Sequence, residues 1–180
     1  GEVLVTGTTG GVGSFAARTL VKLGYEVVGV QRGPEEETFL DSLGLKRIVP
    51  VEEVDDQSGR PLGKGLWAGV IDTVGGNILY TAIKTTRYGG SITCCGNAAS
   101  NSLPATVLPF ILRGITLYGI DSVECPMDYR LRVWNKIAGD WKLDNVEALA
   151  EECSLEELNE KIDMILQGQI QGRVVVNLSR

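Results

Sequence analysis

The sequence predicts an α/β fold in which a doubly wound, parallel, six-stranded sheet carries helices on both faces. Two observations support this prediction. Short valine-rich segments alternate with amphipathic helical segments from residue 2 to residue 120, and this alternation is typical of a parallel sheet covered by helices. A glycine run, GTTGGVG at residues 7–13, stands between the first strand-like segment and the first helical one.

The expected elements of the sheet domain follow one another through short connections. Strands are expected where apolar and β-branched residues gather between turn residues, at 2–6, 26–30, 46–49, 69–72, 91–95 and 115–120. Helices are expected where apolar residues recur at helical spacing or follow a start signal, at 11–23, 34–43, 77–86 and 103–112. Residues 51–66 are acidic and then rich in Gly and Pro, so they predict a surface connection.

The pattern changes after residue 143. We expect the α/β domain to span 1–143 and a helix–strand tail to span 144–180. Residues 127–138 and 154–166 are predicted helices, and Ser154 with Glu157 forms a predicted capping box at the start of the second. Residues 173–178 are a predicted final strand.

Composition excludes several classes of protein. The chain is 43% hydrophobic with a net charge of −6, and its basic residues are scattered singly, so we expect a soluble globular protein with no nucleic-acid partner. No apolar run reaches the roughly 18 residues of a membrane span, and no signal peptide is seen. The four cysteines show no CxxC spacing and histidine is absent, which predicts free thiols in a reducing cytoplasm and no zinc. Because the chain has no histidine, catalysis by a histidine-activated nucleophile is also excluded.

The glycine run is a candidate pyrophosphate site. A strand, a Gly-rich turn and a helix in succession form the context of the dinucleotide fingerprint GxGxxG. Gly10 and Gly13 match its second and third glycines, and Thr8 stands in place of the first. Amides at the helix start favour an anion, so the predicted contacts are Thr8, Thr9, Gly10, Gly11, Val12 and Gly13. The alternative is a bare strand-to-helix turn.

The end of the second strand indicates which dinucleotide is bound. NAD-binding units usually place an acidic residue about 20 positions on, whereas an arginine there suits the 2′-phosphate of NADP. The strand ends in Gln31 and Arg32 without an acid at its tip, and guanidinium pairs well with phosphate. We therefore favour NADPH over NADH, although residues 35–37 are all glutamates; their position at a helix start also explains them.

Three further loops are expected at the carboxyl edge of the sheet, where ligands of open parallel sheets bind. Asp72 is either a cofactor contact or a turn residue, Cys95 is more often a packed residue than a nucleophile, and the role of Asp121 stays open between acid, anchor and exposed turn. The candidate contacts from these loops are Asp72, Thr73, Val74, Cys95, Gly96, Asn97, Ile120, Asp121 and Ser122.

Several stretches together resemble one known family: VTGTTGGVGS, KLGYEVVGV, WAGVIDTVGG, LPATVLPFILRGITLYGIDSV and QGQIQGRVVV. They are similar to the medium-chain dehydrogenase/reductase superfamily, in its zinc-free quinone oxidoreductase-like branch that contains the YhdH/YhfP proteins and NADPH-dependent acryloyl-CoA reductases. The resemblance covers essentially the whole chain, and the block at 103–123 is its most specific part.

The resemblance implies a strand order of 3-2-1-4-5-6 and hydride transfer from NADPH to an activated alkene, in a thioester or quinone-like small molecule. It implies no zinc, and no catalytic residue can be assigned. The second strand of this branch typically ends Ser-Gly-Arg, so Arg32 comes one residue early. The motif QGR ends in Arg173. The Arg173 side chain either reaches the cofactor or the substrate side of the site, or it is a charge on a surface strand.

The resemblance also implies an N-terminal GroES-like domain that these residues do not supply, so we expect one domain of a longer protein. It further implies a homodimer through the sixth strand, from Ile115 to Ile120. Two functions follow as hypotheses: the cofactor domain of an NADPH-dependent reductase, inactive by itself, or a nucleotide-binding or assembly module without catalysis.

Overall fold

The computed structural model describes residues 1–179 and confirms the predicted parallel sheet. Six strands are hydrogen-bonded in the order β3-β2-β1-β4-β5-β6, and every neighbouring pair is parallel. The chain crosses over between β3 and β4, so the carboxyl ends of β1 and β4 form the switch point where open sheets bind ligands. The strands are β1 Val3–Val5, β2 Val27–Gln31, β3 Arg47–Pro50, β4 Trp67–Asp72, β5 Thr86–Cys94 and β6 Thr116–Gly119.

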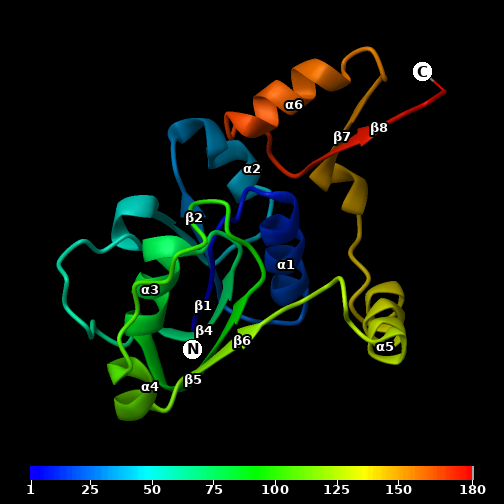
Figure 1. Ribbon diagram of the computed structural model, residues 1–180. Helices are drawn as coiled ribbons and strands as arrows, with labels where there is room; N and C mark the ends of the chain where they lie inside the picture. The colour runs from blue at the N-terminus through cyan, green and yellow to red at the C-terminus, as the bar shows by residue number, and fades with distance from the viewer. Residues whose placement is uncertain (180) are drawn as a thin grey trace.

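Helices cover both faces of the sheet, as the sequence predicts (Figure 1). Because side chains alternate along a strand, Leu4 packs with the cluster under α3 (Gly76–Thr85) and α4 (Leu108–Arg113), while Val5 packs on the opposite face. That opposite face is covered by α1 (Gly11–Lys22) and α2 (Glu37–Asp41). Two separate apolar clusters, one on each face, therefore pack the helices against the sheet.

Three predicted helices are shorter than expected, among them the helix predicted at 154–166, which begins only at Leu158. The segment predicted at 34–43 is a 3₁₀ turn, Pro34–Glu36, followed by the short helix α2. The segment predicted at 103–112 becomes helical only at α4, where Pro109 occupies the first turn and no helical N–H is lost. The connection predicted at 51–66 is irregular apart from one 3₁₀ turn, Val51–Glu53.

The tail forms a small structure of its own beside the sheet (Figure 1). The helix α5 (Met127–Ala138) precedes the tail, whose own elements are a 3₁₀ turn Val146–Leu149, β7 Ala150–Cys153, α6 Leu158–Leu166 and β8 Arg173–Val176. The strand β7 was not predicted, because its sequence AEEC lacks an apolar alternation, yet it pairs in parallel with β8. The hydrogen bonds of the predicted capping box are present, since the Ser154 amide donates to Glu157 Oε2 at 2.7 Å and the Glu157 amide donates to Ser154 Oγ, but the helix itself begins only at Leu158.

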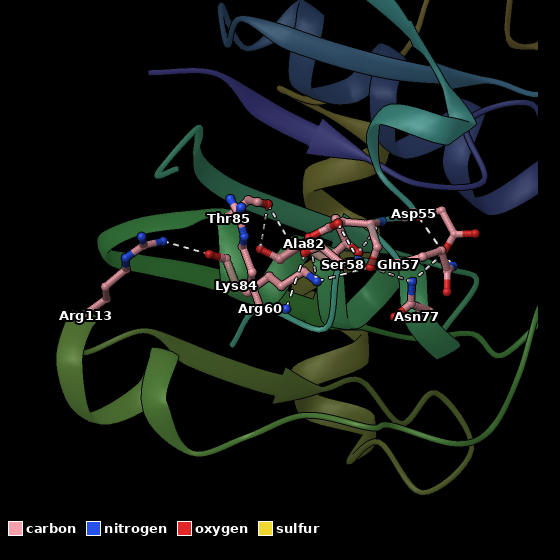
Figure 2. Close-up of polar contacts among 11 residues, drawn as sticks. Asp55, Gln57, Ser58, Arg60, Asn77, Ala82, Lys84, Thr85 and Arg113 are labelled. Atoms are coloured by element: carbon pink, nitrogen blue, oxygen red, sulfur yellow. Dashed lines mark hydrogen bonds and ion pairs between the residues drawn. The ribbon is translucent and has the colours of Figure 1, made fainter. Parts of the chain in front are cut away.

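A polar network joins the long connection to α3 and α4 (Figure 2). Lys84 on α3 is 1% exposed, and its Nζ lies 2.8 Å from Asp56 Oδ2 and 4.9 Å from the ring centre of Tyr80. Arg113 at the end of α4 donates from Nη1 to the carbonyls of Lys84 and Thr86, which end α3 and begin β5. The network therefore fixes the C-terminal end of α3, which lies at the amino edge of the sheet, away from the carboxyl edge.

The ion pair of Asp56 predicts a pH-dependent stability. The hydrogen bond from Lys84, followed by those from Ser58, lowers the pKa of the Asp56 carboxyl from 3.8 to about 2. A carboxyl with a lowered pKa in the folded state stabilises the fold above its unfolded pKa, and this stabilisation is lost as the pH falls through the folded pKa. We expect Asp56→Asn to lower Tm at pH 7, with a difference from the wild type that shrinks between pH 4 and pH 2.

Thermal unfolding followed by circular dichroism measures this difference. Glu52→Gln is the matched control, since Glu52 is an exposed carboxylate on the same connection and its loss should leave Tm nearly unchanged. A Tm difference for Asp56→Asn that stays constant down to pH 2 would contradict the prediction.

Candidate dinucleotide-binding site

The glycine run forms a tight turn between β1 and the start of α1. Gly7 has φ +58°, and a Cβ atom at Gly13 would lie 2.1 Å from the Gly7 carbonyl oxygen. Only glycine at position 13 therefore lets the helix start so close to the strand. Gly10 is the N-cap and offers no side-chain hydrogen bond, so the amides of Gly11 and Val12 lie at the positive end of α1 without a capping side chain. This arrangement suits an anion such as a pyrophosphate.

The two threonines of the turn use their side chains for the fold. Thr8 is buried, donating from Oγ1 to the Val5 carbonyl at 2.6 Å and accepting from the Val30 amide at 2.8 Å, so it joins β1 to β2. Thr9 donates from Oγ1 to Glu36 Oε1 at 3.1 Å. The hydroxyl of Thr8 thus makes a structural link that the glycine of the usual fingerprint does not offer. A cofactor contact by either threonine remains a prediction.

The end of β2 carries Arg32 at the same edge of the sheet as the glycine turn. Its Nε donates to Glu36 Oε1 at 2.8 Å, and its Nη2 lies 2.6 Å from the same oxygen. The Arg32 side chain is 52% exposed, whereas that of Glu36 is 2% exposed. The neighbouring Gln31 folds back on the turn, donating from Nε2 to the Gly33 carbonyl. The structure therefore places a half-exposed guanidinium beside the glycine turn, joined to it through Glu36 and Thr9.

Asp72 at the end of β4 is completely buried. Its Oδ1 accepts from Thr6 Oγ1 at 2.7 Å and its Oδ2 accepts from the Gly75 amide at 2.9 Å. Thr73 adds two further bonds to Thr6, through its amide and its hydroxyl. In this structure the Asp72 carboxylate anchors the loop after β4 to the end of β1, and the Val74 carbonyl accepts from two amides of the segment after β5.

The segment after β5 lies directly against the loop after β4. The Cys95 amide donates to the Asp72 carbonyl, and a Cβ atom at Gly96 would lie 2.1 Å from the Thr73 carbonyl oxygen. Burial, and then the charge of Asp72, raises the pKa of the Cys95 thiol, and the same causes raise that of Cys94. Both thiols are therefore protonated at neutral pH, which disfavours nucleophilic attack, although Cys95 is exposed and Cys94 only half-buried. Asn97 is exposed beside them.

The end of β6 opens into a cavity of about 740 Å³ beside α5. The Ile120 amide continues the sheet by donating to the Cys94 carbonyl at 2.9 Å. Asp121 accepts from the Val123 amide at 2.7 Å, so its carboxylate closes the turn that follows β6. Arg130 of α5 donates to the Ser122 carbonyl. The segment after β6 and aromatic side chains of α5 line this cavity, among them Ile120, Asp121, Ser122, Tyr129 and Trp134.

The tail passes over the glycine turn. The Gly172 amide donates to the Thr9 carbonyl at 2.7 Å, and Gly172 forms a parallel bridge with Gly10. A Cβ atom at Gly11 would lie 2.2 Å from Arg173 Nε, so the Arg173 side chain lies against the helix start. The structure thus brings the QGR motif to the candidate phosphate site.

Two partners of Arg32 escaped the sequence analysis. Glu36 was interpreted only as a favourable charge at a helix start, although its spacing of four residues from Arg32 is typical of ion pairs. The Gly168 carbonyl, which accepts from Arg32 Nη2 at 2.9 Å, carries no signal in the sequence because a backbone group of any residue can fill that role.

The similarity of the chain to known proteins agrees with this geometry. A family model described as zinc-binding dehydrogenase matches residues 11–138. The chain belongs to the zinc-binding dehydrogenase family. A relative in Ruegeria pomeroyi, named acrylyl-CoA reductase AcuI, is 46% identical over 179 residues, which are 99% of this chain and 54% of that protein. The expected resemblance to the quinone oxidoreductase-like and acryloyl-CoA reductase branch is confirmed.

Two solved structures extend the comparison. The YhdH oxidoreductase of Salmonella enterica, described in complex with NADP, superposes with a TM-score of 0.93 at 42% identity, covering 99% of this chain and 54% of that one. The YhfP protein of Bacillus subtilis, described with NAD bound, superposes with a TM-score of 0.92 at 45% identity, covering 99% of this chain and 54% of that one. This member of the zinc-binding dehydrogenase family spans about half the length of the relatives it matches.

The family name mentions zinc, but the side chains present do not fit a zinc site. Among residues 1–179, no three His, Cys, Asp or Glu side chains gather closely enough to hold a metal ion.

No helix within the same residues is both long enough and apolar enough to cross a membrane.

The close approach at Gly13 predicts a large effect of a single methyl group. Gly13→Ala would place a Cβ atom 2.1 Å from the Gly7 carbonyl oxygen, so α1 must shift away from β1. We expect a loss of about 1–3 kcal/mol in the free energy of unfolding, the usual cost of overpacking, measured by urea denaturation. Gly119→Ala is the control, because Gly119 has no heavy atom near its Cβ position. Equal stability of the two variants would show that the contact at Gly13 is not tight.

Proposed function

We propose that the chain is the cofactor domain of an NADPH-dependent oxidoreductase that transfers hydride to an activated alkene, in an acryloyl-CoA-like enoyl thioester or a quinone. The observation that supports this most is the position of Arg32, which lies at the end of β2 beside the glycine turn and carries a half-exposed guanidinium. A turn with free amides and a nearby guanidinium match the pyrophosphate and the 2′-phosphate of NADPH. The AcuI name of a relative at 46% identity supports the reaction class.

The residues of the site are assigned along the length of the dinucleotide. Residues 8–13 would hold the pyrophosphate, and Gln31 and Arg32 the adenosine end with its 2′-phosphate. The loops at 72–74, 95–97 and 120–122 follow along the same edge and would surround the nicotinamide half, and Arg173 would cover the phosphates. The bound cofactor would supply the hydride, while the protein positions it and excludes water.

The hydride acceptor would enter beside the cavity between β6 and α5. This cavity lies next to the loop at 120–122 and is open to solvent. No residue of α5 is buried. We propose that residues 1–143 form the cofactor domain, and that the tail 144–180 packs with a further domain of the longer protein, the GroES-like domain, which completes the acceptor site. A backbone amide or side chain of that domain would then stabilise the enolate.

We also propose that copies of the full protein pair through β6. This strand is at the edge of the sheet, and Tyr118 on it and Ile120 directly after it are half exposed. An unpaired edge of this kind is a template for a second strand, and a two-fold pairing of β6 strands would cover it.

The proposed cofactor predicts selective binding of NADPH. In a fluorescence titration of the folded chain, we expect NADPH to bind in the micromolar range and more tightly than NADH. Arg32→Glu should weaken NADPH far more than NADH, because it replaces the partner of the 2′-phosphate with a like charge. Failure of both dinucleotides to bind below millimolar concentration would contradict the proposed function, and equal losses for both would contradict the role of Arg32.

The incomplete acceptor site predicts binding without turnover. We expect the 180-residue chain to bind NADPH but to oxidise it with little or no measurable rate in the presence of acryloyl-CoA or a quinone. Absorbance at the nicotinamide band measures the rate. The full-length protein serves as the positive control. Robust NADPH oxidation by the chain alone would overturn the proposal that a further domain completes the site.

A further inference from the structure

The carboxylate of Glu36 is the buried partner of the arginine that is proposed to bind the 2′-phosphate. Glu36 lies in the 3₁₀ turn after β2, and its side chain is 2% exposed. It accepts from Thr9 Oγ1 at 3.1 Å, from the Arg32 amide at 2.7 Å and from Arg32 Nε at 2.8 Å. With Arg32 Nη2 at 2.6 Å, four donor groups therefore hold the carboxylate in one orientation, between the glycine turn and the guanidinium.

This pairing occupies one of the guanidinium edges at which a phosphate could bind through two N–H groups. A bidentate contact uses two parallel N–H groups, and Glu36 takes both Nε and Nη2 on one edge of Arg32. The Gly168 carbonyl accepts a further hydrogen bond from Nη2 at 2.9 Å. Among residues 1–179 this leaves Nη1 as the guanidinium nitrogen without a protein acceptor. A phosphate at this place would thus meet one free nitrogen rather than a free fork.

The pairing also cancels the charge that the phosphate would meet. A phosphate monoester carries nearly two negative charges at neutral pH, whereas the Arg32–Glu36 pair has no net charge. The neighbouring Glu35 and Glu37 are exposed, so solvent and salt screen them. Glu36 is buried, and its field at the phosphate is screened least. Among the three consecutive glutamates, Glu36 therefore opposes the 2′-phosphate most strongly.

We infer that Glu36 is a specificity-determining residue: its carboxylate holds Arg32 and limits the preference of the site for NADPH over NADH. The inference rests on the proposed function, since it concerns the same cofactor site. It implies that the site accepts both dinucleotides and that the wild-type preference for NADPH over NADH is modest. NADH lacks the phosphate that Glu36 opposes, and its ribose hydroxyl carries no charge.

Glu36→Gln tests this role, because the amide keeps the size and one acceptor of the carboxylate but removes its charge. Dissociation constants for NADPH and NADH are measured by fluorescence titration of the full 180-residue chain and its variants. We expect Glu36→Gln to bind NADPH about tenfold more tightly, the effect of roughly 1.4 kcal/mol, and to bind NADH within about twofold of the wild type. Asp41→Asn is the matched control, since it removes one exposed negative charge from α2, and it should leave both constants unchanged.

A second variant, Glu36→Met, guards against misfolding of the first, and circular dichroism confirms that each variant is folded. It removes the charge and both acceptors, so the ratio of the NADH to the NADPH dissociation constant should rise in it as well. A ratio that stays constant or falls in the folded variants, while the wild type binds NADPH, would overturn this inference alone. Failure of the wild type and all variants to bind either dinucleotide would overturn the proposed function and the inference with it.

Discussion

The candidate site depends on how closely α1 begins above the end of β1. The first turn of α1 lies within van der Waals distance of the Gly7 carbonyl, and Gly13 is the residue that permits this approach. If the helix began further away, its free amides would point past the edge of the sheet rather than across it. The helix dipole acts only near the first turn, so the position of that turn decides whether the amides form an anion site. The remaining loops are arranged around this point.

Buried polar groups fix the remaining loops at the sheet edge. Asp72 has no exposed surface, and its two oxygens accept from Thr6 at the end of β1 and from the Gly75 amide of its own loop. A buried carboxylate is tolerated only when it is fully hydrogen-bonded, so the ends of β1 and β4 are held in a single arrangement. Glu36 plays the same part between the glycine turn and β2. Two buried acids therefore hold the ends of three strands.

Much of this arrangement could be predicted from the sequence, because it depends on local patterns. The glycine run, the arginine after the second strand and each strand or helix are recognised from residues that are close in the sequence, and the parallel sheet then brings the carboxyl ends of its strands to one edge. The contacts of Glu36 and Gly168 with Arg32 were missed, because they depend on side-chain direction and on a backbone carbonyl far along the chain. The strand β7 was missed because pairing with β8, rather than its own composition, makes it a strand.

The hydrogen bond between Thr9 and Gly172 has a consequence for the order of folding. It joins residues at opposite ends of these 180 residues, and the bond from Arg32 to Gly168 does the same. Contacts of such large sequence separation carry a high cost of loop closure and form after local structure. During synthesis the glycine turn emerges before residues 168–172, so the turn and the ends of the strands beside it can form before the tail lies over them. The contact between the tail and the glycine turn is thus made after the carboxyl edge of the sheet has formed.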